Sequence, residues 1–371
     1  MGRSLWWVGG SGNWSDDDNH WATSSGGSGG DGNLPTSSDD VFFDANSFDG
    51  ADQTVTHDVN VEVASISWSG ATNTPTLAGS TWFYIHGSLT LISGMVYSST
   101  GEINLDGTGS QTFTTGGHSF SCKILINSVD GDTDCTIVGD VTTDSVFGVY
   151  DGTCDFGNYN LTAENIEFSR SETTFGSSNV TATGSFAGFG FYTGGIVNMG
   201  SGTWTLNDQS GDWYVSGGTI NSGTSTIEFT QPYCFFSSGG QTYNDILFTG
   251  GSVSRIENNF TVNNITFGGV EVGGYTPEYY IKGGTEITVL GDFTCSGSVG
   301  VVPYFYGELN NGSRFTLIKS GGSVECDYIE LESSNATGGA HWYAGDNSTD
   351  SGNNRGWIFT DRKYPLPPFS S

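Results

Sequence analysis

Hydrophobic and polar residues alternate along short segments of this chain, with the period of two that is typical of β-strands. In the longest such segment Val55, His57, Val59, Val61 and Val63 alternate with Thr, Asp, Asn and Glu. No window of 12 residues keeps helical spacing without a glycine or a β-breaking cluster. The predicted strands are three to six residues long and are bounded by Gly-Gly, Ser-Gly, Asp-Gly or Asn-Gly turns. The pattern predicts an all-β protein.

One strand-turn-strand unit occurs twice along the chain. Residues 112–126 and 235–248 both place short apolar strands around a glycine pair, at 116–117 in the first copy and 239–240 in the second. Units that repeat with strands in the same direction predict parallel pairing, which a meander or a sandwich does not require. We therefore expect a parallel β-helix body over residues 50–330, with turns of roughly 20–25 residues.

Composition and charge exclude several classes of protein. The chain has 58 Gly and 50 aromatic residues (24 Phe, 16 Tyr and 10 Trp), and only 13% of its residues are charged, which excludes a coiled coil and a disordered chain. Forty acidic residues against ten Lys and Arg give a net charge of −30. Such a surface repels phosphate backbones and anionic membranes, so we expect no nucleic-acid partner. No run of 18 apolar residues is present, so we expect no membrane insertion.

Six cysteines, at positions 122, 135, 154, 234, 295 and 326, contain no Cys-x-x-Cys pair, so a zinc or thioredoxin-like motif is excluded. They fall in alternation with apolar residues and are predicted to face the core as reduced thiols, because a free cysteine packs as a small hydrophobe. The first ten residues contain no apolar stretch that would serve as a signal peptide. We therefore expect the protein to be made and folded in a cytosol.

Tryptophans gather near the two ends of the chain. Trp6, Trp7, Trp14 and Trp21 lie within the first 21 residues, and Trp342 and Trp357 lie between residues 331 and 360. The end turns of a solenoid expose strand edges and core, and large aromatic side chains can cover them. We predict an N-terminal cap or attachment module at 1–49 and a C-terminal cap at 331–360, with these six tryptophans packed in the caps. The alternative is that exposed tryptophans stack on carbohydrate.

Residues 7–21, which read WVGGSGNWSDDDNHW, resemble an opening module found before right-handed parallel β-helices in bacteriophage tail and capsid-associated proteins and in bacterial surface proteins. Residues 341–359, which read HWYAGDNSTDSGNNRGWIF, resemble the closing module of the same phage proteins. The resemblance implies a right-handed parallel β-helix that assembles into a virion in the host cytoplasm. It does not specify which part of the virion, because a fold does not fix a function.

Candidate chemistry is sparse in this sequence. An aspartate cluster could offer oxygen ligands to calcium, although the Asp/Asn spacing of a calcium loop is missing. Its members are Asp16, Asp17, Asp18, Asp39, Asp40 and Asp44. A polysaccharide depolymerase would need two facing carboxylates, for which we considered Asp130, Asp132, Asp134, Asp144, Asp151 and Asp155. Chance clustering explains such a set among 40 acids. The five histidines show no metal spacing, and His57 is expected to be a hydrogen-bonded core residue. We predict no catalytic, cofactor or metal site.

Residues 361–371 form an arm of distinct composition. Three prolines in four positions forbid helix and favour a polyproline path. The arm also carries two basic and three apolar anchors, which are Arg362, Lys363, Tyr364, Leu366 and Phe369. We expect the arm to pack on a neighbouring subunit or another virion protein, and the alternative is a loose chain end.

Together these features predict a non-enzymatic structural virion protein of a bacteriophage, as a fibre, spike or capsid decoration subunit. Its expected partners are further copies of itself in a homotrimer, other virion proteins and a host surface glycan. One alternative is a polysaccharide-degrading tailspike. The other is a bacterial surface adhesin, which the missing signal peptide disfavours.

Overall fold

The computed structural model describes residues 2–127, 133–184, 188–207, 211–250, 254–269, 271, 274, 276–308 and 313–360. The chain is 48% strand and 1% helix and forms about 13 turns of a β-solenoid. The predicted fold class, an all-β parallel β-helix, is therefore confirmed. One helix, α1 (Asp17–His20), occurs in the described residues. Among them no helix has the length and apolar character needed to cross a membrane.

The chain divides into two compact units. Unit 1 comprises Met1–Gly202 with Ser216–Asn221, and unit 2 comprises Thr203–Val215 with Ser222–Ser371. The module boundaries predicted after residues 49 and 330 fall inside these units and stay predictions.

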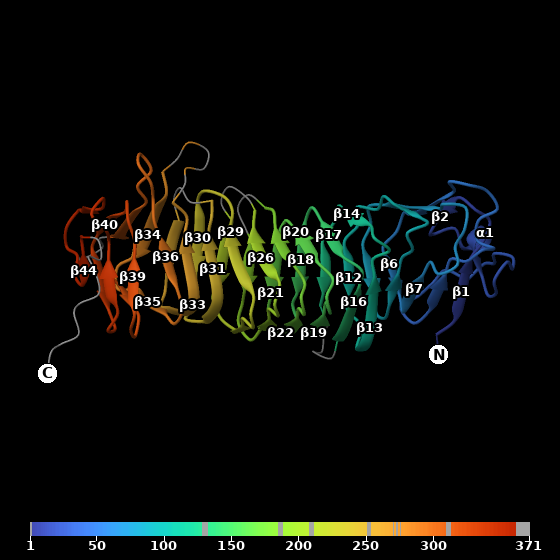
Figure 1. Ribbon diagram of the computed structural model, residues 1–371. Helices are drawn as coiled ribbons and strands as arrows, with labels where there is room; N and C mark the ends of the chain where they lie inside the picture. Colours follow the sequence, from blue (N-terminus) through green and yellow to red (C-terminus); the bar gives the residue numbers. More distant parts are fainter. Residues whose placement is uncertain are drawn as a thin grey trace. The chain divides into compact units, whose positions relative to one another are not determined.

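The strands of unit 1 fall into four groups, which we call sheets A to D (Figure 1). In spatial order, sheet A contains β28 (Thr219–Asn221), β25 (Ile196–Asn198), β22 (Ser171–Thr174), β19 (Gly152–Asp155), β16 (Thr133–Val138), β13 (Gly109–Thr114), β10 (Leu89–Thr90), β7 (Ser65–Ser67), β4 (Asp40–Phe42), β1 (Ser4–Trp7) and β3 (Trp21–Ala22). Sheet B contains β11 (Val96–Tyr97), β8 (Thr76–Gly79), β5 (Thr54–His57) and β2 (Gly12–Asn13). Sheet C contains β24 (Phe189–Phe191), β21 (Asn165–Phe168), β18 (Val146–Val149), β15 (Ile124–Ile126), β12 (Ile103–Leu105), β9 (Phe83–Ile85) and β6 (Val61–Val63). Sheet D contains β14 (Ser119–Phe120), β17 (Val141–Thr143), β20 (Leu161–Ala163) and β23 (Val180–Ala182).

The strands of unit 2 fall into three groups, which we call sheets E to G. Sheet E contains β43 (Thr349–Asp350), β40 (Glu330–Glu332), β37 (Tyr304–Glu308), β34 (Glu278–Lys282), β32 (Ser254–Glu257), β30 (Cys234–Ser237) and β27 (Asp212–Val215). Sheet F contains β26 (Thr203–Leu206), β29 (Thr226–Phe229), β31 (Thr242–Phe248), β33 (Phe260–Phe267), β35 (Glu286–Val289), β38 (Phe315–Ile318) and β41 (Ser334–Thr337), and β36 (Phe293–Cys295) also pairs with β33. Sheet G contains β39 (Ser323–Glu325), β42 (His341–Tyr343) and β44 (Trp357–Ile358).

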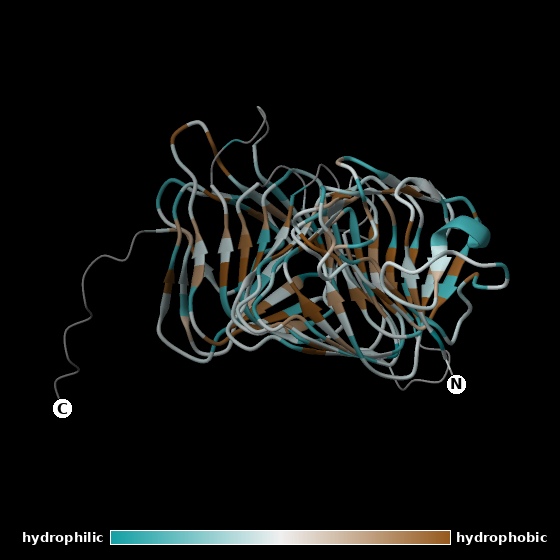
Figure 2. Ribbon diagram, turned by 90° about the vertical axis from the view of Figure 1, so that its right-hand side faces the viewer, coloured by the Kyte–Doolittle hydropathy of each residue, from teal (hydrophilic) through white to brown (hydrophobic). Residues whose placement is uncertain are grey.

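Strand pairing is parallel within each unit, apart from the antiparallel pair β1 and β3. In most strands buried and more exposed residues alternate, as along β16, and hydrophobic positions (brown) recur along the strands in Figure 2. Because the pairing is in register, equal side chains stack from turn to turn. In sheet F the rings of Phe229, Phe248 and Phe267 stack with centroid distances of 4.7 and 5.2 Å.

The glycine pairs of the two sequence repeats adopt the same turn conformation. Gly116 and Gly117 have φ values of 63° and 80°, and Gly239 and Gly240 have 61° and 76°. These left-handed conformations favour glycine because a Cβ atom would be strained there. The aromatic residues expected to correspond, Phe120 and Tyr243, are both 1% exposed. The glycine-pair turn is therefore built in the same way twice, but it connects sheets A and D in the first copy and sheets E and F in the second.

Candidate functional site

Arg3 and Asp39 form a clamp in the N-terminal module. The Arg3 Nη2 and Nε atoms lie 2.7 Å from Asp39 Oδ2 and 3.2 Å from Oδ1, and the backbone N of Arg3 donates to Oδ1 at 2.7 Å. The same guanidinium donates to the carbonyl oxygens of Gly32 and Leu34, and the Thr36 hydroxyl donates to Asp39 Oδ2 at 2.8 Å. The hydrogen bonds from Arg3 hold the pKa of Asp39 far below its usual value, although burial acts in the opposite direction. The clamp ties β1 to the loop that precedes β4.

Three of the predicted cap tryptophans interlock in this module. Trp7, Trp14 and Trp21 are buried, and the ring of Trp21 meets Trp7 at 5.2 Å and Trp14 at 4.8 Å in edge-to-face contacts. The imidazole of His20 stacks on Trp7 at 4.5 Å, and its Nδ1 atom lies 2.8 Å from the Val8 carbonyl oxygen. The three tryptophans and His20 of the segment that resembles an opening module therefore form one packed cluster.

The other three predicted cap tryptophans are placed differently from one another. Trp6 is half-buried and stacks on Phe42 at 5.2 Å, because it follows Leu5 along β1 and points to the opposite face. Trp342 is 1% exposed and meets Phe293 at 5.5 Å. Trp357 is half-buried and contacts Trp342 at 5.2 Å, in register across β42 and β44. The role of these rings as caps stays a prediction. The five anchor residues predicted in the arm, Arg362, Lys363, Tyr364, Leu366 and Phe369, lie outside the described residues.

Three of the aspartates considered for calcium bind different partners. Asp39 is held by Arg3, Asp16 accepts from the Asn19 amide at 2.9 Å, and Asp44 accepts from the backbone N of Asn46 at 2.9 Å. Nowhere in the described part of the chain do three His, Cys, Asp or Glu side chains gather in an arrangement that could hold a metal ion.

The acids considered for a depolymerase also have individual partners. Asp134 accepts from the Thr153 hydroxyl at 2.6 Å, and Asp155 accepts from the backbone N of Gly157 at 2.8 Å. Asp144 accepts from the Ser121 hydroxyl, and Asp151 lies 3.8 Å from the guanidinium of Arg170. Asp130 and Asp132 lie outside the described residues.

A histidine between two carboxylates lies next to the outer face of sheet C, where sequence reasoning did not expect one. His86 Nδ1 is 2.8 Å from Asp106 Oδ1, and His86 Nε2 is 3.4 Å from Glu62 Oε1. Burial raises the pKa of Asp106, and His86 lowers it. Beside this group stand Tyr84, in register with Glu62, and Trp82, which is 49% exposed. The His86 imidazole therefore bridges the side chains of Asp106 and Glu62.

A row of larger side chains crosses the outer face of sheet E in unit 2. Residues of five neighbouring strands are directly in register along it. In order these residues are Phe235, Arg255, Tyr280, Tyr306 and Glu332, and we call them the tyrosine row. The rings of Tyr280 and Tyr306 meet at 3.8 Å in an edge-to-face contact. All but the exposed Arg255 are half-buried, so the row presents flat ring surface together with charge.

Carboxylates flank the tyrosine row. On one side, Tyr304 stacks on Tyr306 at 4.6 Å, and its hydroxyl donates to Glu332. Glu278 and Glu330 lie in register with Tyr304, and the Tyr280 hydroxyl donates to Glu278 at 3.2 Å. On the other side, Glu257 accepts from Arg255 at 2.8 Å and from Lys282 at 3.3 Å. The in-register pairing of β32, β34, β37 and β40 brings these residues together.

His57 and the six cysteines lie in the core, as the sequence predicted. His57 is 1% exposed, its Nδ1 and Nε2 atoms lie 2.8 Å from the Thr81 hydroxyl and 2.7 Å from the Ser99 hydroxyl, and burial lowers its pKa to about 4. The six cysteines are free and buried.

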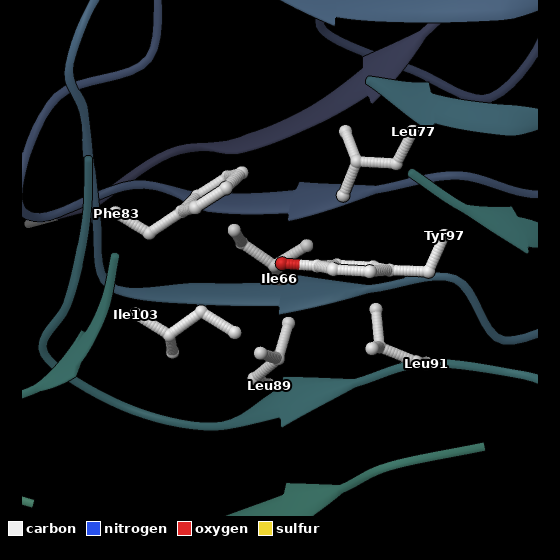
Figure 3. Close-up of a pocket in the computed structure, with 7 residues that line it drawn as sticks. All are labelled: Ile66, Leu77, Phe83, Leu89, Leu91, Tyr97 and Ile103. Atoms are coloured by element: carbon white, nitrogen blue, oxygen red, sulfur yellow. The ribbon is translucent and has the colours of Figure 1, made fainter. Parts of the chain in front are cut away.

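Neighbouring turns of unit 1 enclose a cavity of about 10 Å³, into which Tyr97 reaches (Figure 3). Apolar side chains such as Ile66, Leu77 and Phe83 line the rest of it. A space of this size holds at most one water molecule. We therefore assign no ligand to it.

No protein-family model, curated protein or solved structure matches this chain.

Proposed function

We propose that this protein is a non-enzymatic structural component of a bacteriophage virion, as a fibre, spike or capsid decoration subunit that serves assembly or contact with the host surface. The observation that carries the proposal is the N-terminal module. Its sequence resembles the opening module of phage β-helices, and three of its four tryptophans, Trp7, Trp14 and Trp21, pack into one cluster. The Arg3–Asp39 clamp holds the start of β1 to the loop before β4 in the same module. A packed module followed by parallel solenoid turns suits a stiff, non-catalytic part of a particle.

The location is tested by imaging purified phage particles in which this protein carries a small electron-dense label. Label at a fixed position on every particle supports the proposal, and tail or capsid position identifies the part. Unlabelled particles from cells that contain the labelled protein would refute it.

The proposed partners are two further copies of the chain, other virion proteins and a host surface glycan. The homotrimer is tested by light scattering on the purified protein. A mass three times that of the 39.2 kDa chain is expected, and a mass of one chain across the micromolar range would contradict it.

The His86 group favours a polysaccharide-degrading tailspike as a second candidate. A carboxylic acid of raised pKa beside a second carboxylate is the arrangement that glycoside hydrolysis uses, and Trp82 and Tyr84 offer rings on which a sugar could stack. Host polysaccharide mixed with the protein separates the two candidates. A constant viscosity supports the structural role. A viscosity that falls with the wild-type chain, but not with Asp106→Asn, supports the enzyme, and Glu172→Gln serves as a charge-matched control in the same unit.

A further inference from the structure

Sheet C ends at a strand with one open edge. The N-terminal module supplies β1, β3 and β4 to sheet A and β2 to sheet B. Within the described residues it supplies no strand to sheet C, whose last strand, β6, pairs with β9 along one edge. The other edge of β6 is left for another chain, because an open strand edge presents main-chain donors and acceptors.

The main chain of Glu62 faces this open edge. The backbone N of Val61 donates to the Trp82 carbonyl oxygen at 2.8 Å, and the Val63 carbonyl oxygen accepts from the backbone N of His86 at 3.0 Å. In a parallel pair alternate residues bond to the same neighbouring strand, so the N–H and C=O groups of Glu62 point away from β9. Among the described residues neither group has a hydrogen-bond partner on that other side.

A cavity of about 310 Å³ borders this edge of β6. The N-terminal module contributes Trp14, Leu34, Pro35 and Ser37 to its walls, and the segment that includes β6 contributes Val59 and Glu62. The volume lies within the range of ligand-binding pockets and corresponds to about ten water molecules. It therefore has room for a short piece of extended main chain.

Trp14, which lines this cavity, has an indole N–H without an acceptor. Its side chain is 2% exposed. The indole N–H groups of Trp7 and Trp21 donate to the carbonyl oxygens of Gly10 and Trp14, whereas the N–H of Trp14 donates to no group in the described part of the chain. Because a buried donor without an acceptor costs free energy, an occupant that brings a carbonyl oxygen to this N–H is favoured.

The charge at the edge favours a basic occupant. The Glu62 side chain is 61% exposed, and among the described residues its only ion-pair partner is His86, at 3.4 Å. Opposite charges on neighbouring strands stabilise their pairing, so Lys or Arg suits the position beside Glu62. The residues that flank this basic one would then point inward, as the buried Val61 and Val63 do. An occupant that fits reads apolar, basic, apolar.

We propose that the open edge of β6 binds a short extended segment of another protein, which pairs with the main chain of Glu62 and carries a basic residue between two apolar ones. In strand addition of this kind, main-chain hydrogen bonds give affinity and alternate side chains give specificity. The N-terminal module thereby becomes a receptor for a strand. The inference goes beyond the virion role and does not depend on it.

The test is the binding of a dye-labelled peptide, Thr-Val-Lys-Val-Thr with blocked ends, to the full chain, followed by fluorescence anisotropy. The peptide Thr-Val-Glu-Val-Thr should bind about tenfold more weakly, because its carboxylate meets Glu62. The lysine peptide with N-methyl groups on its three central residues should also bind about tenfold more weakly, because it cannot donate to the Glu62 carbonyl oxygen. Equal binding of the three peptides, or no binding of the first at millimolar concentration, would overturn the proposal.

A charge variant locates the contact. Glu62→Gln should weaken binding of the lysine peptide about tenfold and remove the preference over the glutamate peptide. Glu172→Gln, which makes the same charge change at an exposed position of sheet A in unit 1, should leave both affinities unchanged. A preference that persists in Glu62→Gln would refute the assigned contact.

A second variant fills the cavity. Ser37→Phe should block the space and weaken binding of the lysine peptide more than about tenfold. Ser38→Phe makes the same change at the next exposed position, which does not line the cavity, and should bind the peptide as the wild type does. Circular dichroism shows whether each variant is folded, and the peptide comparisons keep the proposal testable if Ser37→Phe is not. Unchanged binding in a folded Ser37→Phe would refute the site.

A second copy of the chain is the alternative occupant of the edge. Light scattering with and without the lysine peptide separates the two. A mass that the peptide leaves unchanged supports a segment of another protein. A mass that falls as the peptide binds would overturn that assignment and show that the edge is filled by a second copy.

Discussion

Cys135 and Cys154 lie directly opposite each other on the parallel strands β16 and β19, and both side chains are buried. A hydrogen bond between the two thiols, together with burial, raises the pKa of Cys154 far above its usual value. Burial and a hydrogen bond to Cys326 raise the pKa of Cys295 in the same way. Because the thiolate is the reactive form, Cys154 and Cys295 are expected to react slowly in the folded chain.

We predict that none of the six cysteines reacts with a thiol reagent at pH 8 in the native protein. Burial raises the pKa of both Cys122 and Cys234 to about 12, so almost no thiolate is present. In denaturant without reductant all six should react, as a count of released chromophore would show. Three disulfides found under those conditions would contradict both this prediction and folding in a reducing cytosol.

The cysteines also show what the sequence could and could not predict. Alternation with apolar neighbours was enough to predict that all six are buried, because strand parity is a local property. Which cysteines lie next to each other is not a local property, since it depends on the number of residues in each turn of the solenoid. Cys135 and Cys154 are 19 positions apart, whereas Cys295 and Cys326 are 31 apart, so no single repeat length predicts both pairs.

The outer surface was harder to predict for the same reason. Alternation places Tyr280 and Tyr306 on the outside, but only the register of β34 and β37 makes them neighbours. Similarly, His86 and Asp106 each follow a strand of three residues, and the pairing of β9 with β12 brings them together. The repeated glycine pairs were predictable as turns, because glycine adopts the left-handed backbone found there without strain.

The Arg3–Asp39 clamp should stabilise unit 1. Asp39→Asn leaves the guanidinium without its carboxylate and should lower the free energy of unfolding by about 2 kcal/mol. This is less than for a fully buried ion pair, because the Arg3 side chain is 38% exposed. Urea unfolding followed by tryptophan fluorescence measures the loss. Asp31→Asn, at an exposed position of the same module, is the control and should change little.

The clamp also has a pH signature. The pKa of Asp39 is lowered on folding, so its contribution to stability is complete above the ordinary value of 3.8 and is lost as the pH falls below it. As the pH falls from 5 to below 3.8, the free energy of unfolding should therefore decrease more for the wild-type protein than for Asp39→Asn. Parallel curves for the two proteins would argue against the clamp.

The stability of the protein should also depend on pH through His57, which is a basic group whereas Asp39 is an acidic one. The folded chain binds a proton at His57 with a pKa of about 4, whereas the unfolded chain binds it near 6.5. Above about 6.5 this group leaves stability unchanged, and between 6.5 and about 4 protonation favours the unfolded chain. In urea unfolding from pH 7.5 to 4.5, His57→Gln should show a shallower loss of stability than the wild type. His341→Gln, at an exposed site, should follow the wild-type curve.

Substitution of a buried and an exposed tryptophan should show how much the packing of Trp342 contributes to stability. Trp342 is 1% exposed between Phe293 and Trp357, so Trp342→Ala leaves a cavity and should cost about 3–5 kcal/mol. Trp82 is 49% exposed, and Trp82→Ala should cost about 1 kcal/mol or less. Urea unfolding measures the loss of stability in each variant. Hydrogen exchange locates it, because amide exchange in β42 and β44 should become faster in Trp342→Ala only. Equal losses for the two variants would mean that Trp342 does not hold this end of unit 2 together.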